Sequence, residues 1–323
     1  MSTPGTTPAP VQAYPLSTRV ALEALGSFFI VFAGLGTALF SPAGSASTIG
    51  FAYGLALVAC LISFGHVSNG YFNPAFSLAM AVAGRIKWLA AVLYIVAQTI
   101  GAILASAVLV ALLKVMPAGA TPEIPKLFGA LANGFDSHSP SQVPMVGVLI
   151  VEIVLMAVLV AVVLGATSVR NKTTMGPIAI GLAFAVAVTI TMPLSNGSLN
   201  PARATSVVFL AESWAVGQLW LFWLAPLFGA ALAAAVYRSF APARSLAAVD
   251  EPETTSAEAS ELDSATATAA AASTDDDDDD AALPKPVPAV PDAASSPAVA
   301  DAVAPEAAPK NSDAQDFFDS KGK

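Results

Sequence analysis

The sequence predicts an all-α membrane protein with six transmembrane helices and two re-entrant half-helices in an inverted repeat. Three observations predict this fold class. Hydrophobic residues make up 55% of the 323 residues and charged residues only 11%, with a mean hydropathy of +0.69. Six apolar runs have about the length that a helix needs to cross roughly 30 Å of hydrocarbon. A phrase of the form Ser-Asn-Gly-x-x-Asn-Pro-Ala occurs twice, at residues 68–75 and 195–202.

The six long apolar runs are the predicted membrane spans. Two further apolar runs, 74–82 and 201–210, are too short to cross and begin with proline, which a helix tolerates best at its first position. Irregular backbone at membrane depth is tolerated only where it is buried in protein or lines a cavity, so we expect half-helices here. The predicted spans are residues 20–40, 48–66, 88–112, 146–167, 175–194 and 216–237.

The membrane domain is predicted to cover residues 18–241, with repeat halves at about 18–113 and 144–241. The N-terminal segment 1–17 is rich in Pro, Thr and Ala, and we expect it to be disordered. The tail 242–323 is rich in Ala, Pro and acidic residues, including an unbroken run of aspartate. It has too little apolar surface to offset the entropy of ordering, so disorder is predicted. A solvated spacer and a cation- or partner-binding segment both remain open for it.

Charge is divided unevenly along the chain. The net charge is −9. Residues 1–241 contain nine Lys and Arg and five Asp and Glu, whereas residues 242–323 contain five Lys and Arg and eighteen Asp and Glu. No basic nucleic-acid surface follows from this, and we expect no nucleic-acid partner. Most cations flank one side of the spans, which predicts a plasma-membrane protein with both termini cytoplasmic and the loop 116–144 external. These cations are Arg19, Arg85, Lys87, Arg170, Lys172, Arg238 and Arg244.

The internal repeat extends beyond the duplicated phrase. Glu23 precedes Asn73 by 50 positions and Glu152 precedes Asn200 by 48, and both glutamates lie in apolar runs. Each half reads span, span, half-helix, span. Because three spans is an odd number, the second half must enter the membrane upside down. An inverted repeat of this kind places the functional centre near the bilayer midplane.

The two Asn-Pro-Ala elements predict a polar constriction. Half-helices that enter from opposite faces meet at their N-terminal ends, so both positive dipole ends point at the bilayer centre. The side-chain amides of two asparagines can donate hydrogen bonds to a permeant oxygen, whereas a cation would find too few acceptors to replace its hydration shell. Neutral solutes should pass and ions should not. The residues are Asn73, Pro74, Ala75, Asn200, Pro201 and Ala202.

On these motifs the chain resembles the aquaporin, or major intrinsic protein, family over residues 20–237. For that family the exclusion of ions by half-helix dipoles and an arginine is well known. The resemblance implies a right-handed bundle, a homotetramer with one pore per protomer, and a passive channel for water and small neutral solutes in the lipid bilayer. It implies neither an enzyme nor a cofactor or metal.

The resemblance also implies a selectivity ring. Arg203 directly follows the second motif, and an arginine inside a membrane is by default a functional hypothesis. Counting back from the motifs gives Tyr53, Val188 and Gly197 as the other members. Water-selective relatives usually carry Phe, His and a small polar residue or Cys there. Val and Gly predict a wider and less polar aperture, which would admit ammonia, hydrogen peroxide, urea or glycerol.

Three further residues have roles that the family implies. Glu23 and Glu152 would accept hydrogen bonds from the backbone of the two loops that carry the motifs. A buried carboxylate needs such partners on physical grounds as well. His66 would lie near the cytoplasmic vestibule, although a hydrogen-bonded histidine of the bundle is an equally good interpretation.

Alternatives remain. A glycerol facilitator is favoured by the open ring, but Ala204 and the pair Phe222-Trp223 match the water-channel side of the family. An ion-coupled transporter would use acidic residues at the midplane, and only the two glutamates are candidates. A membrane enzyme would need a metal-ligand cluster or a nucleophile with its base, and the spans offer neither.

Overall fold

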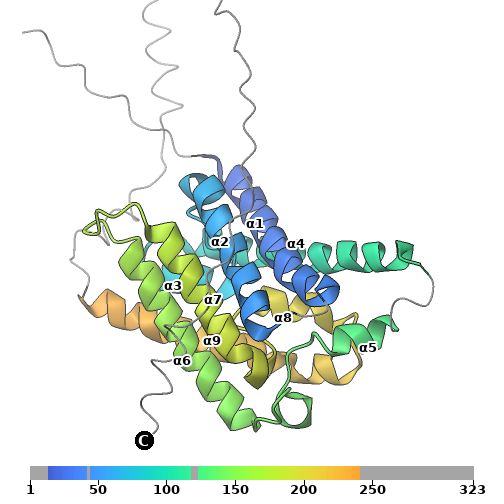
Figure 1. Ribbon diagram of the computed structural model, residues 1–323. Coiled ribbons are helices and arrows are strands. Elements are labelled where there is room, and N and C mark those ends of the chain that lie inside the picture. The colour runs from blue at the N-terminus through green and yellow to red at the C-terminus, as the bar shows by residue number, and fades with distance from the viewer. Residues whose placement is uncertain (1–13, 42–43, 118–122, 241–323) are drawn as a thin grey trace, which may run out of the picture. The chain divides into compact units, whose positions relative to one another are not determined.

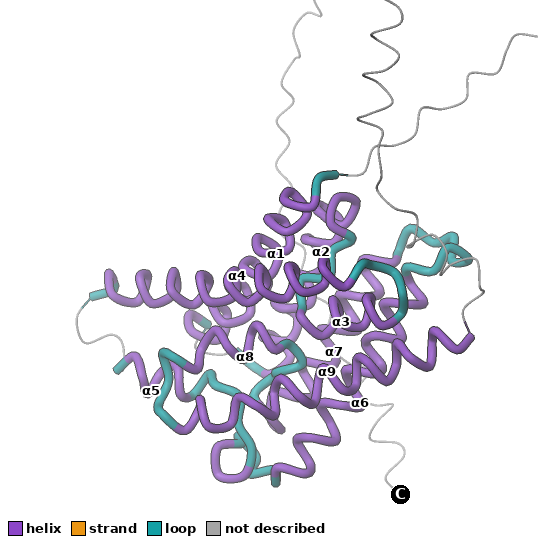
Figure 2. Tube along the Cα trace, turned by 180° about the vertical axis from the view of Figure 1, so that it is seen from behind, coloured by secondary structure: helices purple, strands orange, loops and turns teal. Residues whose placement is uncertain are grey.

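The computed structural model describes residues 14–41, 44–117 and 123–240. Within these ranges all regular structure is helical, as Figure 2 shows by the absence of strand colour from the described chain. The all-α prediction is therefore confirmed. Most of the N-terminal segment 1–17 and all of the tail 242–323, for which disorder is predicted, lie outside the described residues.

Six helices are long and apolar enough to cross a membrane, which confirms the number of predicted spans. Helix α1 begins at Leu16, inside the segment 1–17 that is predicted as disordered. Pro15 presets φ at −53° just before it, and a polar first turn is helical without belonging to any apolar run. The six are α1 (Leu16–Phe40), α2 (Ala46–Ser68), α4 (Trp88–Val115), α6 (Met145–Ala166), α7 (Gly176–Ser195) and α9 (Trp214–Phe240).

Two short helices stand where half-helices are predicted. Helix α3 is Pro74–Val82 and helix α8 is Pro201–Val208, each with proline at its first position. Helix α8 ends two residues before the predicted end at 210. The backbone N–H groups of Leu210 and Ala211 both turn back to the carbonyl of Val207, which closes the helix. The connection between α4 and α6 carries α5 (Ile124–Gly129) and the 3₁₀ turn η1 (Asp136–His138).

Helix packing repeats between the two halves of the chain. Helix α1 packs against α2 and α4, and α6 packs in the same way against α7 and α9, which can be followed in Figure 1. Each half-helix contacts the third span of both halves: α3 lies against α4 and α9, and α8 against α9 and α4. This exchange of partners is what an inverted repeat produces.

Helices α2 and α7 meet where two glycines face each other. A Cβ on Gly54 would lie 2.4 Å from the Gly181 carbonyl oxygen, and a Cβ on Gly181 would lie 2.6 Å from the Gly54 carbonyl oxygen. Gly54 and Gly181 are 127 residues apart, as are Asn73 and Asn200. The reciprocal contact places the pseudo-two-fold axis at this crossing, where only small residues let the backbones approach so closely.

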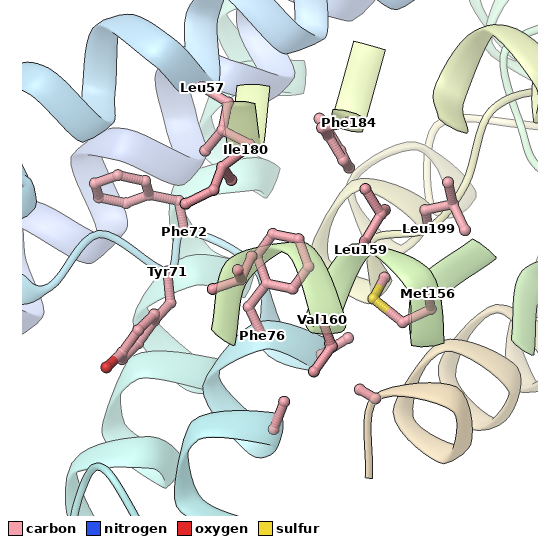
Figure 3. Packing of buried hydrophobic residues seen from close by; sticks show 14 of the residues in the cluster. Leu57, Tyr71, Phe72, Phe76, Met156, Leu159, Val160, Ile180, Phe184 and Leu199 are labelled. Atoms are coloured by element: carbon pink, nitrogen blue, oxygen red, sulfur yellow. The ribbon is translucent and has the colours of Figure 1, made fainter. Parts of the chain in front are cut away.

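The interior combines an apolar cluster with buried polar side chains. Leu57 of α2, Phe76 of α3, Val160 of α6 and Phe184 of α7 belong to one buried cluster that joins the two halves (Figure 3). On the outer surface the spans expose large apolar side chains, for example Leu55, Ile100, Val154, Val186 and Leu224. Polar groups inside and apolar groups outside characterise a multi-pass membrane protein, and this chain is one.

Candidate functional site

The two loops that precede the half-helices share one backbone conformation. The first re-entrant loop is residues 69–73 and the second is residues 196–200. In each, the first, second and fourth residues have positive φ, which is uncommon for bulky side chains and must be held in place by the surroundings. The φ angles are 74°, 70° and 51° at Asn69, Gly70 and Phe72, and 64°, 65° and 55° at Asn196, Gly197 and Leu199.

The two motif asparagines cap the half-helices with their side-chain oxygens. Asn73 Oδ1 accepts from the N–H of Ala75 at 2.9 Å, and Asn200 Oδ1 accepts from the N–H groups of Ala202 and Arg203 at 3.0 and 3.2 Å. With the oxygen used as a helix cap, each NH₂ group points away from its own helix.

The loops also touch each other at their tips. Asn73 Nδ2 donates to the carbonyl oxygen of Leu199 at 2.9 Å, and α3 contacts α8. Both asparagines are buried, and the N-termini of the half-helices therefore adjoin inside the bundle. The structure thus brings together the two Asn-Pro-Ala elements that the sequence separates by 127 residues.

Glu23 holds the first re-entrant loop from helix α1. Its Oε1 accepts from Ser68 Oγ and the N–H of Tyr71 at 2.7 and 3.0 Å. Its Oε2 accepts from the N–H of Phe72 and Gln98 Nε2 at 2.6 and 2.7 Å. A fully buried carboxylate requires such partners, and the bond to Phe72 fixes a residue in the left-handed region.

Glu152 holds the second re-entrant loop from helix α6 with fewer bonds. Its Oε1 accepts from Ser195 Oγ at 2.7 Å and its Oε2 from the N–H of Leu199 at 2.9 Å. Leu199 corresponds to Phe72 in the repeat and has the same left-handed conformation. Both glutamates therefore stabilise a strained residue next to a motif asparagine.

Arg203 lies in the first turn of α8 and is 2% exposed. Nε donates to Tyr53 Oη at 3.2 Å, Nη1 to Asn133 Oδ1 at 2.5 Å and Nη2 to the carbonyl oxygen of Asn196 at 2.8 Å. All the hydrogen-bond acceptors that Arg203 finds within the described residues are uncharged. The guanidinium is buried rather than extended toward an aqueous surface.

Val188 and Gly197 form a second contacting pair beside Arg203. A Cβ on Gly197 would lie 3.2 Å from Val188 Cγ1 and 2.5 Å from Met192 Sδ. Gly197 follows directly on Asn196, whose carbonyl accepts from Arg203, so this pair adjoins the Arg203–Tyr53 pair. The structure brings the four predicted ring residues into one region between α2, α7 and α8.

A cavity of about 490 Å³ opens beyond the C-terminal end of α3. Its lining includes Gly65, Asn69 and Tyr71 but not His66, which is predicted to lie near a vestibule. Gly65 lies on the face of α2 that meets the cavity and Asn69 directly follows the end of α2, whereas His66 is rotated about 100° away from Gly65. His66 is exposed at the surface and lies edge-on to the ring of Tyr14. Tyr71 is a lining residue that the sequence reasoning missed.

Two supporting residues were also missed. Gln98 joins Glu23 to Ser77 Oγ at 2.8 Å, and its position as an amide within an apolar span was a signal that could have identified it. Asn133 contacts Arg203 from the α4–α6 connection, where an Asn-Gly pair is typical of a turn and carries no such signal. Within the described chain no group of three or more His, Cys, Asp or Glu could hold a metal ion.

Comparison with known proteins decides the family. A profile of the major intrinsic protein family matches residues 11–237. The chain belongs to the major intrinsic protein family. Members of this family are passive channels and not enzymes, so this chain is a membrane channel.

Relatives and one solved structure agree with this membership. The chain is 37% identical to aquaporin Z of Photorhabdus laumondii over 225 residues, covering 68% of this chain and 96% of the relative. It is 36% identical to aquaporin Z of Bradyrhizobium diazoefficiens, covering 68% of this chain and 92% of the relative. An aquaglyceroporin structure from Plasmodium falciparum aligns with a TM-score of 0.59 at 20% identity, over 70% of this chain and 97% of that one. At this identity the structural match shows the fold alone.

Proposed function

We propose that this channel conducts water together with small neutral solutes, and that it excludes ions and protons. The observation that carries the proposal is the meeting of two re-entrant loops of the same backbone form, each ending in an asparagine whose amide faces away from its helix. The similarity to two aquaporin Z proteins supports water as the main permeant.

Ion exclusion follows from the chemistry at the loop tips. Two helix N-termini contribute positive partial charge to the same place, and Arg203 adds a full charge one position beyond the second motif. The Asn73 and Asn200 amide groups offer donors to a water oxygen. This is the established explanation for aquaporins as a class, and it is here extended to this chain.

The selectivity ring of Tyr53, Val188, Gly197 and Arg203 sets the range of solutes in this proposal. Val188 presents only methyl groups and Gly197 has no side chain, so the ring is wider than one with histidine and a polar third residue. Glycerol conduction is the second candidate function, and the small, apolar residues at positions 188 and 197 are the observation that favours it.

Glu23 and Glu152 serve as loop supports in this proposal. Both oxygens of each carboxylate already accept hydrogen bonds from protein donors. A transported cation would have to displace these donors and release the strained loop. This argues against the ion-coupled transporter.

Assembly and location belong to the same proposal. We infer a homotetramer with one pore per protomer in the plasma membrane, with both termini on the cytoplasmic side. The cations at the Arg85 end of the bundle support this orientation. The channel domain is residues 18–241 in this assignment, and His66 would lie at the rim of the cytoplasmic mouth rather than in its lining.

Permeability of proteoliposomes tests the function. Stopped-flow light scattering measures water, glycerol and ammonia flux for the wild type, Val188→His and Val188→Leu. We expect the histidine to lower glycerol and ammonia flux relative to water, because it adds bulk and a polar group to the ring. Val188→Leu adds bulk alone and separates the two effects. Unchanged glycerol and ammonia flux in Val188→His would show that Val188 does not line the ring.

A further inference from the structure

We propose that Asn133 is a positioning residue for selectivity: it fixes the orientation of Arg203 and, being uncharged, places no negative charge in contact with the arginine. The inference rests on the proposed function, because it names the residue that makes the Arg203 barrier effective. Asn133 lies in the α4–α6 connection, between α5 and η1, and is 3% exposed. Nothing in its local sequence distinguishes it from an ordinary turn residue.

The side-chain amide of Asn133 is fixed by two kinds of partner. Its Oδ1 accepts from Arg203 Nη1, and its Nδ2 donates to the carbonyl oxygens of Ser195 and Asn196 at 2.9 and 3.0 Å. An arginine can only donate and a carbonyl can only accept, so the amide has one orientation that satisfies every partner. The same residue therefore connects Arg203 to the start of the second re-entrant loop.

The side-chain amide of Asn196 connects the same two segments in the opposite direction, from the second re-entrant loop to the α4–α6 connection. Asn196 Nδ2 donates to the carbonyl oxygens of Ala130 and Ala132 at 2.7 and 3.0 Å. Asn133 and Asn196 thus cross-link residues 130–133 to the second re-entrant loop in both directions. Asn69, the counterpart of Asn196 in the first loop, lines the open cavity beside α3 instead. The bracing is specific to the half of the chain that carries Arg203.

Because residue 133 is an asparagine and not an aspartate, no negative charge lies in contact with the Arg203 guanidinium at this position. An aspartate has the same shape and could accept the same bond from Nη1, but it would place a negative charge in contact with the guanidinium. Its second oxygen would also face the carbonyl oxygens of Ser195 and Asn196, to which Asn133 Nδ2 donates. The carboxylate of Glu152 directs its hydrogen bonds to Ser195 and Leu199. Asn133 is therefore the position where a single atom replacement would neutralise Arg203 directly.

Neutralising Arg203 would remove the charge that a cation meets on approach. Two opposite charges in hydrogen-bond contact attract each other strongly even at an effective dielectric constant of about 20. A neutralised Arg203 no longer repels an entering cation, so the barrier to cation entry falls. We expect cation flux to rise at least about tenfold.

The test compares Asn133→Asp with Ser137→Asp and the wild type in proteoliposomes. Ser137 is exposed in the same connection, within η1, so its substitution adds equal charge at a site that makes no contact with Arg203. Water flux is measured by stopped flow, and sodium and proton flux by entrapped indicators in the same vesicles. We expect the ratio of cation to water flux to rise at least about tenfold in Asn133→Asp and to stay at the wild-type value in Ser137→Asp.

Wild-type behaviour in Asn133→Asp would overturn the inference while leaving the proposed function intact. A wild type that fails to conduct water, or that leaks cations, would instead refute the proposed function. Should Asn133→Asp fold poorly, Asn133→Ala supplies the decision. Arg203 then keeps its charge but loses an anchor, so we expect glycerol flux to rise relative to water while cations stay excluded. An unchanged ratio of glycerol to water flux in Asn133→Ala would overturn the positioning role.

Discussion

The first re-entrant loop is held from within the bundle, whereas the second is held largely by the α4–α6 connection. In the first loop Glu23 accepts four hydrogen bonds, one of them from Gln98 of α4. In the second loop Glu152 accepts two, and Asn133 braces the loop from the other side. The backbone is the same in both loops although the supports differ.

Helices α4 and α9 show where the asymmetry arises. Gly101 of α4 and Gly229 of α9 make equivalent contacts with α1 and α6, at the carbonyl oxygens of Ala24 and Ile153. Counting three residues back from each glycine gives Gln98 in α4 and Pro226 in α9, and proline has no side-chain donor. A repeat can therefore keep its geometry while one half specialises in support and the other in selectivity.

The largest expected effect is the difference in stability between variants of the two glutamates. In Glu23→Gln either orientation of the new amide turns its NH₂ toward a backbone N–H, because Tyr71 and Phe72 donate to opposite oxygens. We expect the free energy of unfolding to fall by about 3–5 kcal/mol, which is typical of breaking a buried charged network. In Glu152→Gln the amide oxygen can face Leu199 while Ser195 Oγ accepts from the NH₂ group, so about 1–2 kcal/mol is expected.

Thermal unfolding of the purified proteins in detergent measures both variants. The unfolding midpoint should fall much further for Glu23→Gln than for Glu152→Gln. Equal midpoints would mean that the two loops depend on their carboxylates to the same degree, and the comparison between them would fail.

The next effect concerns the crossing of α2 and α7, where the pseudo-two-fold axis is placed. Gly54→Ala and Gly181→Ala each place a methyl group against the other helix's carbonyl oxygen, at 2.4 and 2.6 Å without relaxation. Overpacking of this kind costs about 1–3 kcal/mol, and the reciprocal contact predicts a similar loss for both variants. Gly217→Ala is the matched control, since its Cβ would meet nothing within 4 Å. A strong difference between the first two variants in the unfolding midpoint would contradict a two-fold axis at this crossing.

The smallest effect is expected for a substitution that gives the first half of the chain the residue found in the second half. Tyr94 Oη accepts from Arg19 Nε at 2.8 Å and donates to the carbonyl oxygen of Ser68 at 3.2 Å. By the register of the paired glycines, α9 carries Phe222 at the corresponding place. Tyr94→Phe removes both bonds, but the partly exposed Arg19 can bond water instead. We therefore expect the free energy of unfolding to fall by only about 1–2 kcal/mol, the net value of two ordinary hydrogen bonds. In the same thermal unfolding measurement, a loss as large as that of Glu23→Gln would show that Tyr94 is a principal support of the first loop.

Much of the fold and part of the site could be predicted from the sequence because the chain repeats itself. The spacing of Glu23 to Asn73 and of Glu152 to Asn200 pairs the glutamates with the loops, and the structure has both pairs in contact through the residue before each asparagine. Asn133 breaks the repeat and comes from an irregular connection, so no periodicity could identify it.

Helix rotation explains why His66 lies outside the cavity lining. His66 is next to Gly65 in the sequence, yet about 100° separates neighbouring side chains on a helix. The cavity is lined by Gly65 and by Tyr71, which belongs to the loop after the helix. Sequence distance from the motif indicated the right end of α2 but not the face, because α2 has no strong apolar stripe to set the register.

The central claim is that neutral molecules cross between the two loop tips while charged ones do not. Wild-type protein in proteoliposomes tests it through water permeability and proton flux recorded on the same vesicles. We predict water permeability well above that of protein-free vesicles, together with proton flux at the protein-free level. Proton flux that rises with water permeability as the protein content increases would contradict the account.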